Sequence, residues 1–141
     1  MTMEDYEDVR DLWLHTPGMG LNTSDDSREG IARYLRRNPE TCFVARCGAE
    51  LAGVILAGHD GRRGYIYHTA VLPAYRGRGV GRLLVERAMD ALEREGIHKA
   101  ALVAFARNAD GNAFWEHMGF TVRDDLVYRN REIHPLQRVE T

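Results

Sequence analysis

The apolar positions of this 141-residue chain alternate between helical and strand-like spacing. Near the N-terminus, apolar residues recur at three- and four-residue intervals, which predicts helices over Glu4–Leu14 and Ser27–Asn38. A loop rich in glycine, asparagine and serine separates them at Thr16–Ser27. Shorter apolar runs then predict three strands, the first two joined by a tight turn: Thr41–Arg46, Leu51–Gly58 and Tyr65–Leu72.

The second half of the chain begins with the longest helical pattern. It predicts a helix over Gly79–Glu95, which ends at Gly96. His98–Phe105 is apolar on both faces, as is typical of a central strand beside a parallel neighbour. A short helix over Asn108–Met118 follows. The last apolar runs, Phe120–Arg123 and Leu126–Ile133, predict a hairpin that closes the chain.

This order of elements predicts the α/β class with a mixed central sheet. The sheet combines an antiparallel meander with one parallel βαβ junction, a right-handed crossover through Tyr65–Phe105. With 44% apolar residues, the chain can bury a core, and we expect one domain over residues 1–141. Ligands of open α/β sheets bind at the carboxyl ends of parallel strands. The predicted ligand site therefore lies beside Leu72–Gly81.

A glycine- and arginine-rich turn stands at that position. It reads Arg76-Gly77-Arg78-Gly79-Val80-Gly81 and joins a strand to the first turn of a helix. Such a turn exposes unpaired backbone N–H groups at the positive end of a helix dipole, while arginines supply forked phosphate donors. The turn has neither the Gly-Lys-Ser/Thr ending of a P-loop nor the third glycine of a dinucleotide fingerprint. It predicts a phosphate or pyrophosphate site; the alternative is a plain turn with solvated arginines.

Composition excludes several other classes. The net charge of −2 argues against a general nucleic-acid binder, and no apolar run is long enough to span a membrane. The acidic N-terminus is not a signal peptide, so we expect a cytoplasmic location. The two cysteines, Cys42 and Cys47, are interpreted as inert thiols. The histidines show no metal-ligand spacing.

Four segments stand in a characteristic order and spacing within about residues 40–123: Val71–Pro73, Tyr75–Gly81, Asn108 and Phe114–Phe120. Together they resemble the GNAT family of N-acetyltransferases. The run Gly58–Gly64 is similar to a small bacterial subgroup of uncharacterised members. The resemblance implies the acyl-CoA N-acyltransferase fold, acetyl-CoA as the donor, a small-molecule or peptide primary amine as the acceptor, and direct transfer. Homodimers are common in this family, so a homodimer is a further expectation.

The resemblance also implies a set of cofactor-binding residues. The turn and the following arginine hold the pyrophosphate, and the backbone around Val71 pairs with pantetheine. A backbone N–H near Ala70 or Val71 polarises the thioester carbonyl, and Asn108 contacts the CoA arm. The full set is: Ala70, Val71, Leu72, Arg76, Gly77, Arg78, Gly79, Val80, Gly81, Arg82, Asn108 and Trp115.

The chain departs from its family at two points. Trp115 stands where a tyrosine usually protonates the departing thiolate, and an indole N–H is not a usable acid. We expect Trp115 to pack against the pantetheine instead. The family usually opens with a strand before the first helix, and Met1–Glu4 leaves little room for one. That strand is expected to be very short or missing.

The candidate catalytic residues are Tyr67, His68 and Tyr128. Strand alternation predicts that Ile66 and His68 share one face of the sheet, with Tyr65, Tyr67 and Thr69 on the other. Tyr67 or His68 could relay the proton of the acceptor amine, although packing is the alternative role for each. Tyr128 lies in the predicted hairpin, which often borders the acceptor pocket.

An acidic cluster begins the second predicted helix, with Asp25, Asp26 and Glu29. These residues either attract a cationic amine or stabilise the helix N-terminus. The function predicted for the whole chain is acetyl-CoA-dependent N-acetylation. The main alternative is a non-catalytic acyl-CoA-binding or sensor module, and a weaker one is an arginine–glycine contact to nucleic acid.

Overall fold

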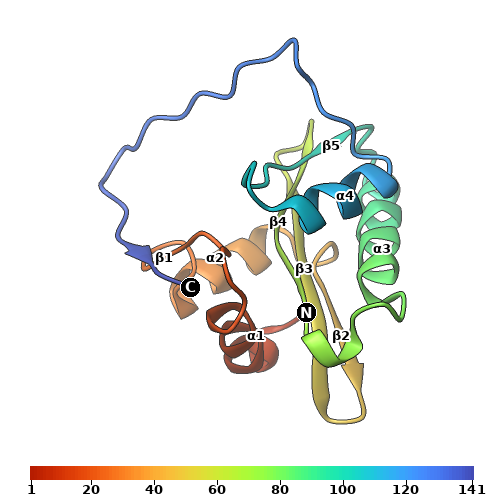
Figure 1. Cartoon of the computed structure of the whole chain (residues 1–141). Helices are drawn as coiled ribbons and strands as arrows, with labels where there is room; N and C mark the ends of the chain where they lie inside the picture. The colour runs from red at the N-terminus through yellow and green to blue at the C-terminus, as the bar shows by residue number, and fades with distance from the viewer.

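A four-stranded sheet forms the centre of the computed structural model, which describes residues 1–141 (Figure 1). Strands β2, β3 and β4 are antiparallel neighbours, and β5 lies parallel to β4, in the order β2-β3-β4-β5. This confirms the predicted mixed sheet, meander and single parallel junction. The bounds of the strands are: β2 Phe43–Cys47, β3 Glu50–His59, β4 Gly64–Val71 and β5 Ala100–Ala101.

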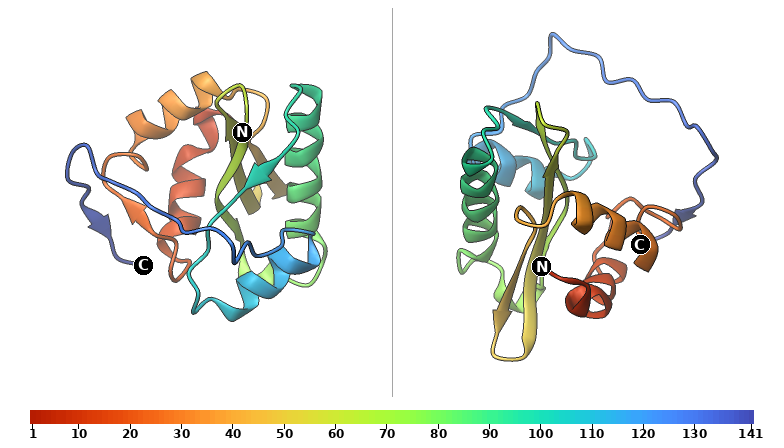
Figure 2. Two further views of the ribbon diagram at one scale, coloured as in Figure 1. Left: turned by 90° about the horizontal axis from the view of Figure 1, so that it is seen from above. Right: turned by 180° about the vertical axis from the view of Figure 1, so that it is seen from behind.

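Helices cover both faces of this sheet (Figure 2). Helices α1 (Tyr6–Leu14) and α2 (Arg28–Arg37) lie on one face, and α3 (Val80–Arg94) and α4 (Ala109–His117) on the other. No strand precedes α1; residues 3–5 form a short 3-10 helix instead, as residues 73–75 do after β4. None of the helices is long and apolar enough to cross a membrane.

The central strand β3 separates two apolar cores. Val54 and Leu56 face the core under α1 and α2, whereas Ile55 and Ala57 face the core under α3. All four are buried, with exposed fractions of 3% or less. Because successive side chains of a strand point to opposite faces, a continuous apolar run such as β3 is what a strand between two helical layers requires.

Local signals in the sequence set the helix starts. The Ser27 hydroxyl accepts a hydrogen bond from the Gly30 N–H at 3.0 Å and begins α2, as expected of an N-cap. The Asn108 side chain does the same for α4, accepting from the Gly111 N–H at 3.0 Å. Helix α3 has no side-chain cap; its N-cap residue is Gly79, whose φ of 82° lies in the left-handed region. Its first N–H groups are therefore left without a protein acceptor.

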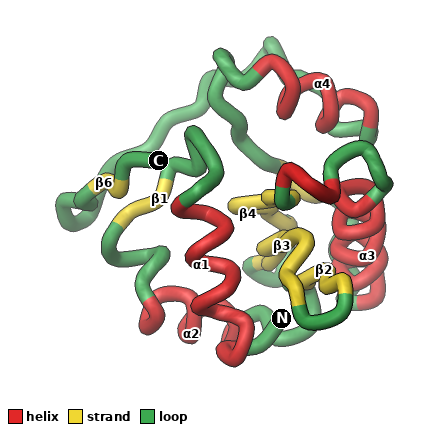
Figure 3. Tube along the Cα trace, turned by 60° about the horizontal axis from the view of Figure 1, so that its bottom comes forward, coloured by secondary structure: helices red, strands yellow, loops and turns green.

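The C-terminal third of the chain differs from the prediction. The expected strand over His98–Phe105 pairs with β4 only at Ala100 and Ala101. The expected hairpin of Phe120–Arg123 and Leu126–Ile133 does not form. The chain instead runs in an extended arc from α4 to β6 (Arg138–Val139), which pairs with β1 (Leu21–Asn22) (Figures 1 and 3).

The early end of β5 explains this difference. A hairpin becomes stable when it adds to an existing sheet edge or covers an apolar face. Here the chain after Ala101 leaves the sheet, and residues 120–137 have no strand to pair with. Beyond Phe120, which packs against Trp115, their apolar side chains stay exposed, with Leu126 at 60% and Ile133 at 92%.

Candidate functional site

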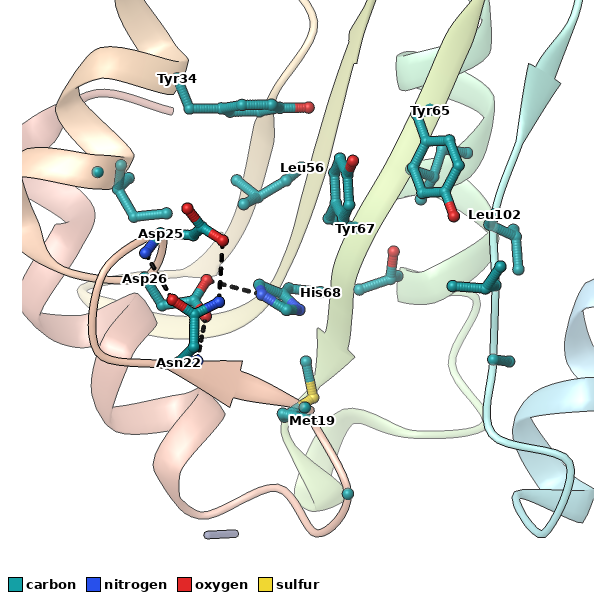
Figure 4. A pocket seen from close by; sticks show the side chains of 18 of the residues that line it. Met19, Asn22, Asp25, Asp26, Tyr34, Leu56, Tyr65, Tyr67, His68 and Leu102 are labelled. Carbon is teal, nitrogen blue, oxygen red and sulfur yellow. Dashed lines mark hydrogen bonds and ion pairs between the residues drawn. The ribbon is translucent and has the colours of Figure 1, made fainter. Parts of the chain in front are cut away.

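A large cavity opens where β4 and β5 separate. The two strands pair only at Gly64–Ala100 and Tyr65–Ala101, and beyond this point the chain over residues 102–105 diverges from β4. The space between and beside them is about 840 Å³ (Figure 4). Its walls come mainly from residues 18–26, helix α2, residues 65–69 of β4 and the segment from Leu102 to Asn108, with Leu56 of β3 and Trp115 of α4 added.

The glycine-rich turn follows the far end of β4. Gly77 and Gly79 have φ values of 73° and 82°, a backbone conformation that favours glycine. The amide N–H groups of residues 77–82 donate to no other protein group, because the first backbone hydrogen bond of α3 runs from the Leu83 N–H to the Gly79 carbonyl at 3.0 Å. A row of free amides at a helix N-terminus fits a pyrophosphate.

The arginines around the turn differ in how strongly the protein holds them. Arg76 Nε donates to the Val71 carbonyl at 3.1 Å, so this side chain braces the end of β4. The Arg78 guanidinium lies over the Tyr75 ring, 5.5 Å from its centroid. Arg82 forms an exposed ion pair with Glu86 at 3.3 Å. Arg78 and Arg82 are exposed enough to turn toward an anion, whereas Arg76 is largely structural.

Gly81 brings α3 and α4 together beside the turn. A Cβ at this position would lie 3.3 Å from the Phe114 ring and 3.6 Å from a Val71 methyl group. Phe114 packs edge-on against Trp115, with ring centroids 5.0 Å apart, and Trp115 in turn contacts Phe120. This aromatic cluster fixes α4 at the border between the turn and the cavity.

A histidine–carboxylate pair, of which the carboxylate is buried and the imidazole partly buried, lies in the wall of the cavity (Figure 4). His68 Nε2 is 2.7 Å from Asp26 Oδ1, and the two side chains are 15% and 8% exposed. The second oxygen of Asp26 accepts from the Asn22 N–H at 2.7 Å. A carboxylate only accepts hydrogen bonds, so in the neutral form of this imidazole Nε2 carries the proton and Nδ1 has the free lone pair. This is the arrangement of a base that a carboxylate orients.

A bulge in β4 points His68 toward Asp26. The ladder with β3 passes from Leu56–Tyr67 to Val54–Ala70, so His68 and Thr69 together oppose Ile55. His68 has a φ of 43° and is the only residue besides glycines with a positive φ. Its carbonyl accepts from Trp13 Nε1 at 3.0 Å, and the Trp13 ring packs edge-on against the imidazole. Backbone strain of this kind is found at functional sites more than elsewhere.

The bulge also breaks the regular alternation of side chains that was predicted for this strand. Ile66 packs into the core under α3, whereas His68 lies on the α1–α2 side with Trp13 and Asp26. The prediction that Ile66 and His68 share a face is therefore wrong. An inserted residue shifts the two-residue period of a strand, and a single sequence gives no signal of where that occurs.

Three tyrosines line the cavity around this pair. Tyr67 contacts Tyr34 edge-on, with centroids 6.0 Å apart, and Tyr65 at 4.6 Å. Burial raises the pKa of Tyr65 to about 12, and burial also raises the pKa of Tyr67 above its usual value. The Tyr34 hydroxyl is buried without a hydrogen-bond partner. None of these phenols is a ready base near neutral pH.

The structure brings only some of the predicted residues together. Tyr67, His68, Asn108 and Trp115 line the same cavity, although the Asn108 side chain also caps α4. Ala70, Val71 and Leu72 continue β4 toward the turn, with Ala70 buried. Tyr128 does not line the cavity. It lies on the extended segment and is 66% exposed, because the predicted hairpin that would contain it does not form.

The pairing of His68 with Asp26 does not follow from the sequence. The two residues are 42 positions apart, and neither stands in a recognisable motif. In sequence, Asp26 belongs only to an acidic cluster at a helix start, and its neighbour Glu29 is exposed and does not line the cavity. The one usable signal is the combination of a histidine on the strand before the turn with acidic residues at the start of α2.

Comparison with known proteins agrees with the resemblance. The model of the acetyltransferase (GNAT) family matches residues 6–120. A bacterial protein named acetyltransferase from Photorhabdus laumondii is 35% identical over 100 residues, which is 71% of this chain and 68% of that protein. Another protein named acetyltransferase, from Sodalis glossinidius, is 29% identical over 92% of this chain and 90% of its own.

Solved structures share the fold at low identity. The PaiA N-acetyltransferase of Thermoplasma acidophilum in complex with coenzyme A has a TM-score of 0.75 at 18% identity, with 88% of each chain covered. AAC(6')-Iy in complex with a bisubstrate analogue has a TM-score of 0.69 at 18% identity, with 94% of this chain and 95% of that chain covered. Together with the family match and the bacterial relatives, the free amides of the turn and the separated strands lead to one conclusion: this chain belongs to the GNAT family and is an acetyl-CoA-dependent N-acetyltransferase.

Proposed function

We propose that the protein transfers the acetyl group of acetyl-CoA directly to a primary amine, with His68 as the general base. The observation that carries this proposal is the His68–Asp26 pair, 2.7 Å apart in the wall of the cavity beside the separated strands. The acceptor is a small molecule or a peptide. In this assignment the turn at residues 76–82 binds the pyrophosphate and the diverging end of β4 receives the pantetheine arm.

The reaction needs a neutral amine. A lysine-like amine is protonated at neutral pH, with a pKa near 10, and an ammonium ion has no lone pair for attack. His68 Nδ1 takes one proton, directly or through a water, while Asp26 stabilises the imidazolium. The amine nitrogen then bonds to the thioester carbonyl carbon and loses its second proton to water, and collapse of the tetrahedral intermediate breaks the C–S bond. The products are the acetamide and CoA.

A backbone donor of β4 stabilises the developing oxyanion. The N–H of Ala70 or Val71 is the candidate, since both lie on the strand that leads from the bulge to the turn. A preorganised donor of this kind is worth several kcal/mol in known enzymes. Trp115 cannot protonate the departing thiolate, because its indole N–H is not acidic. The proton that His68 has taken, or a water, supplies that step.

His68 suits the base better than either tyrosine. Burial raises the pKa of Tyr67, so a phenolate there is further from neutral pH than in solution. Tyr128, the third candidate, is largely exposed and does not line the cavity. We therefore assign Tyr67 to the wall of the acceptor pocket and keep Tyr128 outside the catalytic step.

The test is thiol release from acetyl-CoA with a panel of primary amines, with the acetamide identified by mass. We expect turnover with at least one amine and a thermal shift with acetyl-CoA alone; a ligand at one hundred times its Kd stabilises a protein by about 2.7 kcal/mol. No thermal shift would refute acetyl-CoA binding. A shift without turnover across the panel would favour the alternative, an acyl-CoA sensor, for which the tryptophan at position 115 is the supporting observation.

A further inference from the structure

Helix α2 presents an unusual set of side chains to the cavity. Of its ten residues, five line the cavity, and four of these follow helical spacing at three- and four-residue intervals: Gly30, Arg33, Tyr34 and Arg37. Residues at this spacing share one face of a helix. Two arginines, one turn apart, therefore border a cavity whose other residues are mainly apolar and aromatic.

Neither arginine has a charged partner. Arg33 and Arg37 form no ion pair and donate no side-chain hydrogen bond, whereas Arg28 on the same helix pairs with Glu7 at 2.6 Å. Like charges one turn apart on a helix repel each other and destabilise the helix. An anionic ligand group between the two guanidinium groups would relieve that repulsion and accept forked hydrogen bonds.

The end of the cavity where His68 lies, called here the catalytic end, carries negatively charged side chains instead of arginines. Asp26 pairs with His68, and the neighbouring Asp25 lines the cavity without a basic partner; its carboxylate accepts from the Asn22 side chain at 3.0 Å. Asp25 and Asp26 lie just before α2, and the two arginines lie toward its end. With a rise of 1.5 Å per residue, the arginines follow the acidic end by roughly 10–16 Å along the helix axis.

The wall between these two ends is aromatic and apolar. Tyr34 stands on α2 between the arginines in sequence, and its ring meets Tyr67 of β4 edge-on (Figure 4). Leu56 of β3 lines the same part. A hydrocarbon chain packs well against such a surface, whereas a second charge midway along the acceptor would lose its hydration there.

From this polarity we propose that the acceptor is an amine whose carbon chain ends in an anionic group held by Arg33 and Arg37. The separation of the two ends excludes a simple α-amino acid that reacts at its α-amine, because amine and carboxylate are then adjacent. The same separation fits an acceptor whose terminal amine lies several carbons from a carboxylate, as in an ω-amino acid, a lysine-type side chain or a short peptide. This inference rests on the proposed amine acetylation and names the acceptor class.

The test compares two acceptors that differ only in the anionic group, aminocaproate and hexylamine. Thiol release is measured for both with the wild type and with R33A, R37A and R36A. Arg36 lies between the two arginines in sequence and does not line the cavity, so R36A is the matched control. We expect kcat/KM to be about tenfold higher for aminocaproate, as a charge-assisted hydrogen bond of about 1.5 kcal/mol would give.

The expected result is that R33A and R37A each remove most of this preference, mainly through KM, while R36A keeps it. The preference should also shrink with added salt, because both arginines are exposed. Equal kcat/KM for the two acceptors, or loss of the preference in R36A as well, would overturn the inference while leaving amine acetylation intact. No turnover with either acceptor or the wider amine panel would overturn the proposed function instead.

Discussion

The two halves of the site are built from different parts of the chain. The half assigned to the cofactor is built from backbone: the end of β4 for the pantetheine arm and, for the pyrophosphate, residues 76–82, whose N–H groups from residue 77 onward have no protein acceptor. The half assigned to the acceptor is made of side chains from separate elements, with Asp26 before α2, His68 on β4 and Trp13 from α1 around one imidazole. A site made of backbone tolerates many side chains, whereas a site made of paired side chains fails when one partner is lost.

This difference has a physical origin. Glycines and a helix start are sufficient to present free amides, so the cofactor half needs little more than the correct local conformation. An oriented base needs a partner at hydrogen-bond distance, and the fold must hold that partner there. Here the bulge in β4 and the burial of Asp26 meet that requirement.

The largest expected effect is on the acceptor half. In D26N the amide can donate toward Nε2, so the imidazole is no longer held with its lone pair on Nδ1. We expect kcat to fall by about 100-fold or more, with acetyl-CoA affinity unchanged, as measured by steady-state kinetics and titration calorimetry. E29Q, in the same acidic cluster but outside the cavity, serves as the control. An equal loss of acetyl-CoA affinity in D26N would contradict the separation into two halves.

The matching change in the cofactor half is G79D. This position has a positive φ, and a Cβ added there would meet no atom within 4 Å, so an aspartate adds negative charge beside the free amides without a clash. We expect the Kd for acetyl-CoA to rise by about 100-fold, or about 2.7 kcal/mol. G79N tolerates the same backbone conformation without the charge and should bind several times more tightly than G79D. Unchanged affinity in G79D would remove the turn from the site.

A smaller effect is expected at the border of the two halves. Trp115 lines the cavity and packs between Phe114 and Phe120. W115Y keeps an aromatic ring and adds an acidic hydroxyl, so we expect kcat to rise a few-fold if thiolate protonation limits the reaction. W115F is the control, since it lacks the hydroxyl. Equal activity in the two variants would mean that protonation of the thiolate is not limiting.

The smallest effect concerns the start of α2. S27A removes the N-cap hydrogen bond to the Gly30 N–H and the one that the hydroxyl donates to the Ser24 carbonyl at 2.7 Å. We expect a loss of about 1 kcal/mol in unfolding free energy, seen as a small fall in Tm, and a modest fall in kcat because Asp26 precedes this cap. S27N, which also caps helices, should recover most of the stability. Acetyl-CoA affinity should not change in either variant.

The parts of the fold set by local pattern are predicted well. The sheet order, the long helix after the turn and the start of α2 at Ser27 all follow from apolar spacing and capping residues. The parts that depend on where a partner strand lies are predicted poorly. Phe105 and Leu126 have strand-like neighbours in sequence, but β5 ends at Ala101 and no edge receives them.

The same division holds for the site. Gly77, Gly79 and the helix start predict an anion-binding turn from the sequence alone, because a local run of residues fixes the backbone conformation that exposes the amides. His68 and Asp26 give no such signal, since the contact between them depends on a bulge and on the packing of α2 against the sheet. The sequence by itself therefore determined the family and the cofactor, and it predicted the anion-binding turn. Only the tertiary structure decided that His68 pairs with Asp26 and which charges border the cavity, because those residues are brought together by long-range packing.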